Sequence, residues 1–364
     1  MTERDGVLVI ADGEGHLLKR VSRGWVGYSS SRRHQELISS DEEHPFSFCR
    51  RGERLGMLYW IDLLAFAQEP RAARAPQCLM FHHLMDQEIP PFRPKMRFAD
   101  AITTPSLRWQ RRIGELFGVQ ATVVPYVLDT NLFSPVGRDE ARASMEIPSD
   151  SFVLGFSAKA SADAFGRKGI DLFAEVVAAA ASVWPDITVL LIGTGWDQLA
   201  SSLRATGTRV VHRSPVRSDD TASLYPAMDV FLCTAREEGG PCTVLEAMSC
   251  GVPVVTTDVG HVPELITDGE RGFIIEERKA EHFIRAIRHL REDEALRQNV
   301  IQAARQFIVI DRDERNAVPR IPFDKIYDEA QRNFARRSRW EVASRYPVQL
   351  YLGARYVARR IAGR

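Results

Sequence analysis

The chain has 364 residues, a length that suits two compact domains better than one. Hydrophobic residues make up 45% and charged residues 26% of it, which is average for a globular protein and excludes a disordered, collagenous or coiled-coil chain. The 48 Lys and Arg residues balance the 48 Asp and Glu residues, so the overall charge does not favour a nucleic-acid partner.

The cysteines and the hydropathy pattern both indicate an intracellular protein. None of the five cysteines is spaced as C-x-x-C, so we expect reduced thiols in the core rather than disulfides or a zinc site. There is no apolar stretch of about 18 residues, and the first residues lack the pattern of a signal peptide. The sequence therefore predicts a cytoplasmic location.

Short apolar runs bounded by polar residues, proline or glycine predict buried strands. In the first half they cover residues 7–11, 78–81 and 121–124, while the pattern does not define the fold of residues 20–75. In the second half they cover residues 152–156, 187–192, 209–211, 229–233, 252–256 and 272–275, with helical stretches such as 170–183 between them. This alternation predicts an α/β fold with parallel sheets, and the polar region 135–150 is the expected domain boundary.

The segment after the strand expected at 229–233 is the main candidate binding site. In a parallel sheet, ligands bind at the carboxyl ends of strands, where the amides at the next helix N-terminus attract an anion. Gly239 and Gly240 allow close approach to the backbone, and a helix is expected from about Thr243, so a phosphate is the expected ligand. Glu238 and Glu246, eight residues apart, can both face a polyhydroxyl ligand.

A structural interpretation of Glu246 is also open at this point. Thr243 and Glu246 are spaced as a capping box, in which the Glu246 carboxylate would only accept from an amide of its own helix.

Several motifs resemble, in the same order, those of the family-four retaining glycosyltransferases of the GT-B fold, also called glycosyl transferases group 1. Residues 238–255 read EGGPCTVLEAMSCGVPVV and resemble the family signature. Residues 124–135 (VPYVLDTNLFSP) resemble its interdomain crossing, and residues 191–195 (LIGTG) resemble its second strand end in the C-terminal domain. Residues 260–266 (GHVPELI), with Asp268, Gly269, Gly272 and Phe273, resemble its last block of motifs.

The resemblance implies an α/β protein of the GT-B class, with two Rossmann-like parallel-sheet domains and a cleft between them. It implies an acceptor-side domain at residues 1–140, a nucleotide-sugar-binding domain at 141–320, and a basic helical tail at 321–364 that can return to the N-terminal domain. The implied donor-binding residues are Gly15, Lys159, Lys168, Gly239, Gly240, Cys242, Thr243 and Glu246.

Two cations are expected on the donor diphosphate. The family carries an Arg and a Lys there, and Lys159 stands where Arg is usual, which replaces a bidentate fork by a point charge. Arg167, beside Lys168, is an alternative second cation. Glu246 would then accept ribose hydroxyls.

Glu238 and His82 are the residues to which the resemblance implies a catalytic role. Glu238 would contact hydroxyls of the transferred sugar near the reacting carbon, and His82 would meet the sugar from the N-terminal domain. His83 is the fallback for His82, and a histidine pair that only caps Asp86 is the structural alternative. No metal-binding motif is present, so we expect neither a metal nor another cofactor.

The C-terminal tail is strongly basic. From Arg332 to Arg364 it holds nine arginines and one acidic residue, Glu341. A helix starting at Pro347 would place an apolar stripe opposite its arginines. Such a helix can lie on an anionic membrane surface or pack on the N-terminal domain.

The motifs therefore predict a retaining glycosyltransferase that moves a sugar from a nucleotide-sugar donor to a glycan, glycolipid or other hydroxyl acceptor, in cell-surface polysaccharide biosynthesis. The predicted location is cytoplasmic and peripheral at the inner face of the membrane. Two alternatives stay open: a catalytically weak GT-B protein that binds glycans or partners, and a sugar-nucleotide epimerase.

Overall fold

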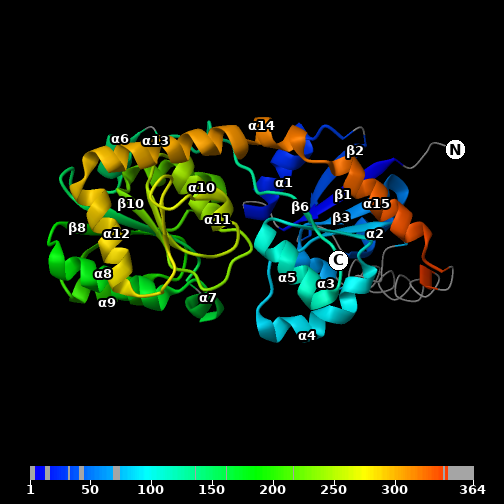
Figure 1. Ribbon diagram of the computed structural model, residues 1–364, viewed down its shortest axis with the longest axis horizontal. Helices are drawn as coiled ribbons and strands as arrows, with labels where there is room; N and C mark the ends of the chain where they lie inside the picture. The colour runs from blue at the N-terminus through cyan, green and yellow to red at the C-terminus, as the bar shows by residue number, and fades with distance from the viewer. Residues whose placement is uncertain are drawn as a thin grey trace, which may run out of the picture. The chain divides into compact units, whose positions relative to one another are not determined.

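The chain folds into two compact units in a computed structural model (Figure 1). The structure describes residues 5–12, 17–31, 33–40, 45–68, 74–135, 137–160, 162–215, 217–338 and 341–342. Unit 2 is Leu128–Asn316, and unit 1 combines Met1–Val127 with Ala317–Arg364.

Unit 1 contains a parallel sheet whose order is β2-β1-β3-β4-β5-β6 among the described residues. Its strands are β1 (Gly6–Ala11), β2 (His34–Ser39), β3 (Gly56–Trp60), β4 (Gln77–Met80), β5 (Ala101–Thr104) and β6 (Thr122–Val123). Its helices are α1 (Leu17–Tyr28), α2 (Pro45–Leu55), α3 (Leu63–Gln68), η1 (Asp86–Glu88), α4 (Ile89–Phe92), η2 (Arg93–Phe98), α5 (Leu107–Phe117), η5 (Val318–Arg320) and α15 (Phe323–Ala335). The strand β1 is fully buried, as its uninterrupted apolar run requires.

The helix α15 belongs to unit 1 although it follows unit 2 in the chain. It packs on β4 and β5, and the Tyr327 ring meets the Tyr59 ring edge to face with 6.3 Å between centroids. Beyond the helix, Arg337 Nε donates to the buried Asp100 carboxylate at 2.5 Å. One arginine of the basic tail is thus bound inside unit 1. Residues 339–340 and 343–364, which hold the predicted amphipathic helix, lie outside the described residues.

Unit 2 contains a second parallel sheet, with the order β12-β11-β10-β7-β8-β9 in the part of the chain that the structure describes. Its strands are β7 (Phe152–Ser157), β8 (Ile187–Ile192), β9 (Arg209–Arg213), β10 (Val230–Cys233), β11 (Val254–Thr257) and β12 (Phe273–Ile275). Its helices are α6 (Arg138–Ser144), α7 (Ala162–Arg167), α8 (Ile170–Val183), α9 (Asp197–Ala205), η3 (Ser218–Ser223), η4 (Tyr225–Ala227), α10 (Cys242–Ser249), α11 (Val262–Leu265), α12 (Ala280–Glu292) and α13 (Glu294–Asp311). The short α14 (Glu314–Ala317) leads back to unit 1.

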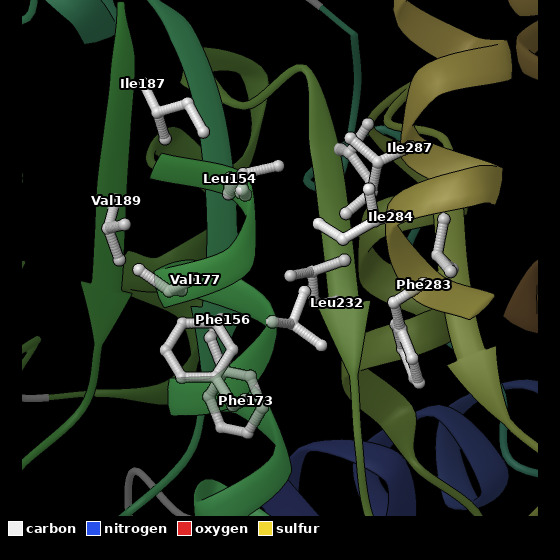
Figure 2. Packing of buried hydrophobic residues seen from close by; sticks show 14 of the residues in the cluster. Leu154, Phe156, Phe173, Val177, Ile187, Val189, Leu232, Phe283, Ile284 and Ile287 are labelled. Carbon is white, nitrogen blue, oxygen red and sulfur yellow. The ribbon is translucent and has the colours of Figure 1, made fainter. Parts of the chain in front are cut away.

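The core of unit 2 lies between the sheet and the helices α8 and α12, which pack against each other (Figure 2). Phe156 of β7 and Phe173 of α8 are in direct ring contact, with 4.4 Å between centroids. Leu232 of β10 and Phe283 of α12 extend the same apolar cluster, and both are fully buried. This packing anchors β7 and β10, the two strands that precede the segments of the candidate site.

The α/β fold with parallel sheets is confirmed. Each strand predicted from the sequence is present, with ends shifted by no more than two residues. The structure adds β2, β3 and β5, which the apolar pattern did not define. All five cysteines are free and buried, as their spacing predicted. Among the residues that the structure describes, none of the helices combines the length and hydropathy needed to span a bilayer.

The division into units falls earlier than the expected boundary at residue 140. Unit 2 begins at Leu128, whose amide donates to the Arg312 carbonyl at 3.0 Å and whose carbonyl accepts from the Glu314 amide at 3.1 Å. Thr130 Oγ1 donates to the buried Asp313 carboxylate at 2.6 Å, and Arg315 Nε donates to it at 2.8 Å. Residues 128–130 are therefore bound to residues 312–315 of unit 2.

The polar region 135–150 is a part of unit 2 and not a linker. Its Arg142, on α6, is buried and donates to the Ala227 carbonyl at 3.0 Å and to the Asp229 carboxylate at 2.7 Å. Two of the charged residues that suggested a boundary, Arg138 and Arg142, are thus bound to Asp229 inside the unit.

We expect Asp313→Asn to destabilise the protein. Burial would raise the pKa of Asp313, but hydrogen bonds from Arg315 and Thr130 outweigh burial and lower it to about 2, so the carboxylate is charged at neutral pH. Removing the charge weakens both contacts, and the free energy of unfolding should fall by about 1–3 kcal/mol, measured by urea denaturation. The exposed Asp150→Asn is the control, and equal midpoints for the two variants would contradict the expectation.

Candidate functional site

The end of α7, which follows β7, and the loop after β10 are bound together at the carboxyl edge of the unit 2 sheet, where β7 and β10 are neighbours. Thr234 Oγ1, at the end of β10, donates to the Gly169 carbonyl at 2.8 Å. The Arg236 amide donates to the Arg167 carbonyl at 2.7 Å. Residues 167–169 and 234–236 therefore form one backbone platform.

Glu238 lies on this platform as a buried carboxylate. Its Oε1 is 2.6 Å from Lys168 Nζ and 3.2 Å from Arg167 Nη1. The structure thus brings Glu238 and Lys168 together and adds Arg167, the alternative second cation. Lys159 lies on the loop after β7 with an exposed side chain, while the Ala158 amide beside it donates to the Ile192 carbonyl at 3.0 Å.

Glycines allow two loops to pack backbone to backbone beside Glu238. A Cβ on Gly240 would be 2.6 Å from the His261 ring, and one on Gly260, whose φ is +51°, would be 2.8 Å from the Gly239 carbonyl oxygen. Larger residues at either position would push the loops apart. Burial, with Arg312 nearby, lowers the pKa of His261 to about 3, so its ring is neutral.

The helix α10 starts directly after these glycines. Its N-cap is Pro241, whose side chain offers no acceptor to the amides of the first turn. Cys242 is buried and Thr243 is half-buried in this turn, and the helix dipole places positive charge there. An anion would be stabilised at this helix end.

Glu246 is one turn further into α10, and the capping-box alternative is wrong. Thr243 lies inside the helix rather than at its N-cap. The buried Glu246 carboxylate instead accepts from the Tyr225 hydroxyl at 2.6 Å. Burial raises the pKa of Tyr225 far above its usual value, so this hydroxyl keeps its proton and donates. Sequence reasoning missed Tyr225, because it is 21 residues away from its partner.

A second missed residue supports the platform from the other side. Arg278, on the loop after β12, donates from Nη2 to the Thr234 carbonyl at 2.9 Å. The guanidinium also approaches Gly169, where an added Cβ would be 2.7 Å from Nη2. Its place in the run Glu276-Glu277-Arg278-Lys279 gave no signal, since such charge runs are typical of solvated loops.

His82 lies in unit 1, after β4, and both of its ring nitrogens are hydrogen-bonded. Nε2 donates to the Ile61 carbonyl at 2.7 Å, so Nδ1 is the unprotonated nitrogen and accepts from the Tyr126 hydroxyl. Burial lowers the pKa of His82 to about 4. The ring is therefore neutral at pH 7 and held in one tautomer. The neighbouring His83 is half-buried, with its ring 6.5 Å from the Trp109 ring centroid.

Gly15 lies outside the described residues. Asp12 and Lys19, which come before and after the undescribed residues 13–16, are hydrogen-bonded to each other. Asp12 Oδ1 accepts from the Lys19 amide at 2.8 Å, and the buried Lys19 Nζ donates to Ser39 Oγ at 2.7 Å. In the described part of the chain, no group of three or more His, Cys, Asp or Glu side chains is placed to hold a metal ion.

Comparison with known proteins now identifies the unit that carries this platform. Residues 137–307 match the family model described as glycosyl transferases group 1. Unit 2 is a group 1 glycosyltransferase domain. The resemblance to glycosyl transferases group 1 is thereby confirmed for residues 137–307, which include Glu238, the paired glycines and Glu246.

Two curated relatives share about 30% identity with about half of the chain. The D-inositol 3-phosphate glycosyltransferase of Arthrobacter sp. (strain FB24) is 30% identical over 190 residues, which is 50% of this chain and 44% of the relative. The lipopolysaccharide core biosynthesis mannosyltransferase LpsB of Rhizobium meliloti (strain 1021) is 31% identical over 189 residues, 45% of this chain and 48% of the relative. The matches thus span less than half the length of these relatives.

Two solved structures share the fold of nearly the whole chain. Anabaena Alr3699/HepE, in complex with UDP and glucose, has a TM-score of 0.70 at 18% identity, covering 91% of this chain and 99% of its own. WaaG, a glycosyltransferase involved in lipopolysaccharide biosynthesis, has a TM-score of 0.66 at 16% identity, covering 88% and 99%. The predicted GT-B fold class is confirmed.

The buried neutral His82 predicts a loss of stability in mild acid. The unfolded ring takes a proton near pH 6.5 and the folded ring only near pH 4, so stability is constant above about pH 6.5 and falls as the pH drops towards 4. From pH 7.5 to pH 5, His82 alone should cost about 2 kcal/mol of unfolding free energy. Urea denaturation at both pH values should show a smaller loss in His82→Gln than in the wild type. The same loss in both would argue against a buried neutral ring.

Proposed function

We propose that the chain is a retaining glycosyltransferase that moves a sugar from a nucleotide-sugar donor to a hydroxyl group of a glycan or lipid-linked acceptor, in cell-surface polysaccharide biosynthesis. The observation that carries the proposal is the platform of unit 2: two cations, paired glycines and an uncapped helix N-terminus lie beside two buried carboxylates. The relatives named for glycosyl transfer to inositol phosphate and in lipopolysaccharide assembly support this substrate class.

The chemistry of each group fits one part of such a donor. Arg167, Lys168 and the first amides of α10 suit a diphosphate and would stabilise the negative charge that develops on it as it leaves. The positive charge of these groups supports transfer without a metal ion or another cofactor. Glu246 suits the ribose hydroxyls and Glu238 the hydroxyls of the transferred sugar, because a charged hydrogen bond contributes about 1.5–3 kcal/mol.

A retaining reaction needs no nucleophile from the protein in this proposal. The leaving diphosphate takes up the acceptor's proton while the new bond forms on the same face of the sugar. The protein then contributes orientation and electrostatic stabilisation. In unit 1, both ring nitrogens of the buried His82 are bound to Ile61 and Tyr126, so a contact of this ring with the donor sugar would require one of these hydrogen bonds to be exchanged.

The test is a panel of nucleotide sugars, assayed by the rise in melting temperature and by the release of nucleotide with and without added acceptor. Because the fold is shared with Anabaena Alr3699/HepE, solved with UDP-glucose, UDP-sugars come first. A donor that raises the melting temperature and releases nucleotide supports the proposal. Binding without turnover would instead indicate a catalytically weak binding protein, and a changed sugar nucleotide without acceptor would indicate an epimerase.

Glu246→Ala should weaken binding of the nucleotide sugar by about tenfold or more, since it removes a charged acceptor of ribose hydroxyls. Glu246→Gln should keep part of the affinity, because its amide oxygen still accepts. Isothermal titration measures both. Tyr225→Phe is the control, because it removes the hydroxyl bound to Glu246 but leaves the carboxylate. Normal binding by both Glu246 variants, with only a lower melting temperature, would make Glu246 a structural partner of Tyr225.

The basic tail supports a second part of the proposal, a cytoplasmic enzyme that associates with the inner face of the membrane. Deleting residues 343–364 should abolish sedimentation with anionic vesicles while the donor still binds, because every proposed donor contact lies before residue 270. Salt should mimic the deletion, since it screens exposed charges within about 8 Å. An insoluble truncated protein, with a full-length chain that ignores vesicles, would show that the tail packs on the fold.

A further inference from the structure

Glu238 is the shared partner of both cations of the proposed diphosphate site. One oxygen, Oε1, pairs with Lys168 Nζ and with Arg167 Nη1. The Lys168 and Arg167 side chains retain 24% and 23% exposure, whereas the Glu238 side chain retains 7%. A phosphate arriving from solvent therefore meets the two cations, with the carboxylate covered behind them.

The backbone beneath these side chains leaves little room for the loops to rearrange. The hydrogen bonds of Thr234 and Arg236 join the two loops, and Arg278 holds the Thr234 carbonyl. A Cβ on Gly169, whose φ is +66°, would be 1.9 Å from the Thr234 carbonyl oxygen. The two backbone segments are therefore already in van der Waals contact. A ligand can change the pairing of the cations mainly by side-chain rotation.

We propose that Glu238 is an internal counter-ion of Arg167 and Lys168, and that the diphosphate of the donor takes its place on them. This inference rests on the proposed function and adds a coupling to it. The diphosphate offers several charged oxygens to the arginine fork and the lysine ammonium, whereas Glu238 offers two. Because like charges repel, the carboxylate turns away from the cations as the phosphates bind.

This exchange of counter-ions couples the binding of the phosphates to the contact between Glu238 and the sugar. A buried carboxylate that has lost its cations must find other hydrogen-bond donors, and the hydroxyls of the sugar supply them. Once the sugar has been transferred, the hydroxyls leave with the product, and Glu238 competes again for Arg167 and Lys168. The same carboxylate thus orients the sugar before transfer and favours release of the nucleoside diphosphate afterwards.

The experiment measures the affinity of nucleoside diphosphates that carry no sugar. UDP, GDP, ADP and TDP are titrated into the wild type, and the tightest is compared with Glu238→Gln, in which the internal competitor has lost its charge. We expect Glu238→Gln to bind this nucleotide about tenfold more tightly, which is about 1.4 kcal/mol, and to turn over the sugar donor more slowly. The exposed Glu276→Gln, on the loop after β12, is the matched control and should leave the affinity unchanged.

Lys168→Met separates ion exchange from simple repulsion. In the Lys168→Met background, the gain from Glu238→Gln should fall to about threefold, because one of the two competed cations is missing while Arg167 remains. The proposed replacement of Glu238 by the diphosphate would be overturned by a gain in affinity of the same size with and without Lys168. Unchanged or weaker nucleotide binding by Glu238→Gln would overturn it as well. Glu238→Ala, checked by its melting temperature, repeats the measurement if the glutamine variant is unstable. If no diphosphate binds to the wild type, the proposed function itself fails.

Discussion

The backbone contact between the loops after β7 and β10 is the constraint on which the site of unit 2 depends. Thr234 and Arg236 bind the carbonyls of Gly169 and Arg167, and position 169 must be glycine because any side chain would strike the Thr234 carbonyl. This contact sets the distance from the Arg167 and Lys168 side chains to the Glu238 carboxylate, which lie on segments that follow different strands. Ion pairs alone could not do so, since partly exposed pairs contribute little and their side chains move.

The helix α10 is held at its C-terminal end and open at its N-terminal end. Arg305 donates to the carbonyl of Ser249, the last residue of α10, at 2.5 Å, and also to the Thr130 carbonyl at 2.9 Å. A cation at the helix C-terminus stabilises the helix dipole, and the uncapped first turn leaves the opposite end for an anion. The same arginine therefore connects the start of unit 2 to the helix that carries Glu246.

The sequence predicted the strands of unit 2 well and those of unit 1 only in part, and two of the missed strands, β2 and β5, have a physical reason. Among the described residues, the strand β2 pairs only with β1, and it reads HQELIS, so this edge strand with polar residues shows no apolar run. The strand β5 reads AITT, yet Thr103 is fully buried and shares a 2.8 Å hydrogen bond with the Tyr59 hydroxyl. A buried polar residue that finds its partner 44 residues away is not recognisable from local pattern.

The sequence by itself determined the parallel α/β fold and the segment 238–246, because apolar periodicity, glycines and the spacing of two carboxylates are local properties of the chain. Only the tertiary structure decided which partners these residues have. It paired Glu238 with Arg167 and Lys168, it left Lys159 exposed, and it gave Glu246 the Tyr225 hydroxyl in place of a helix amide. Hydrogen bonds and ion pairs act over about 3 Å in space, whatever the separation along the chain.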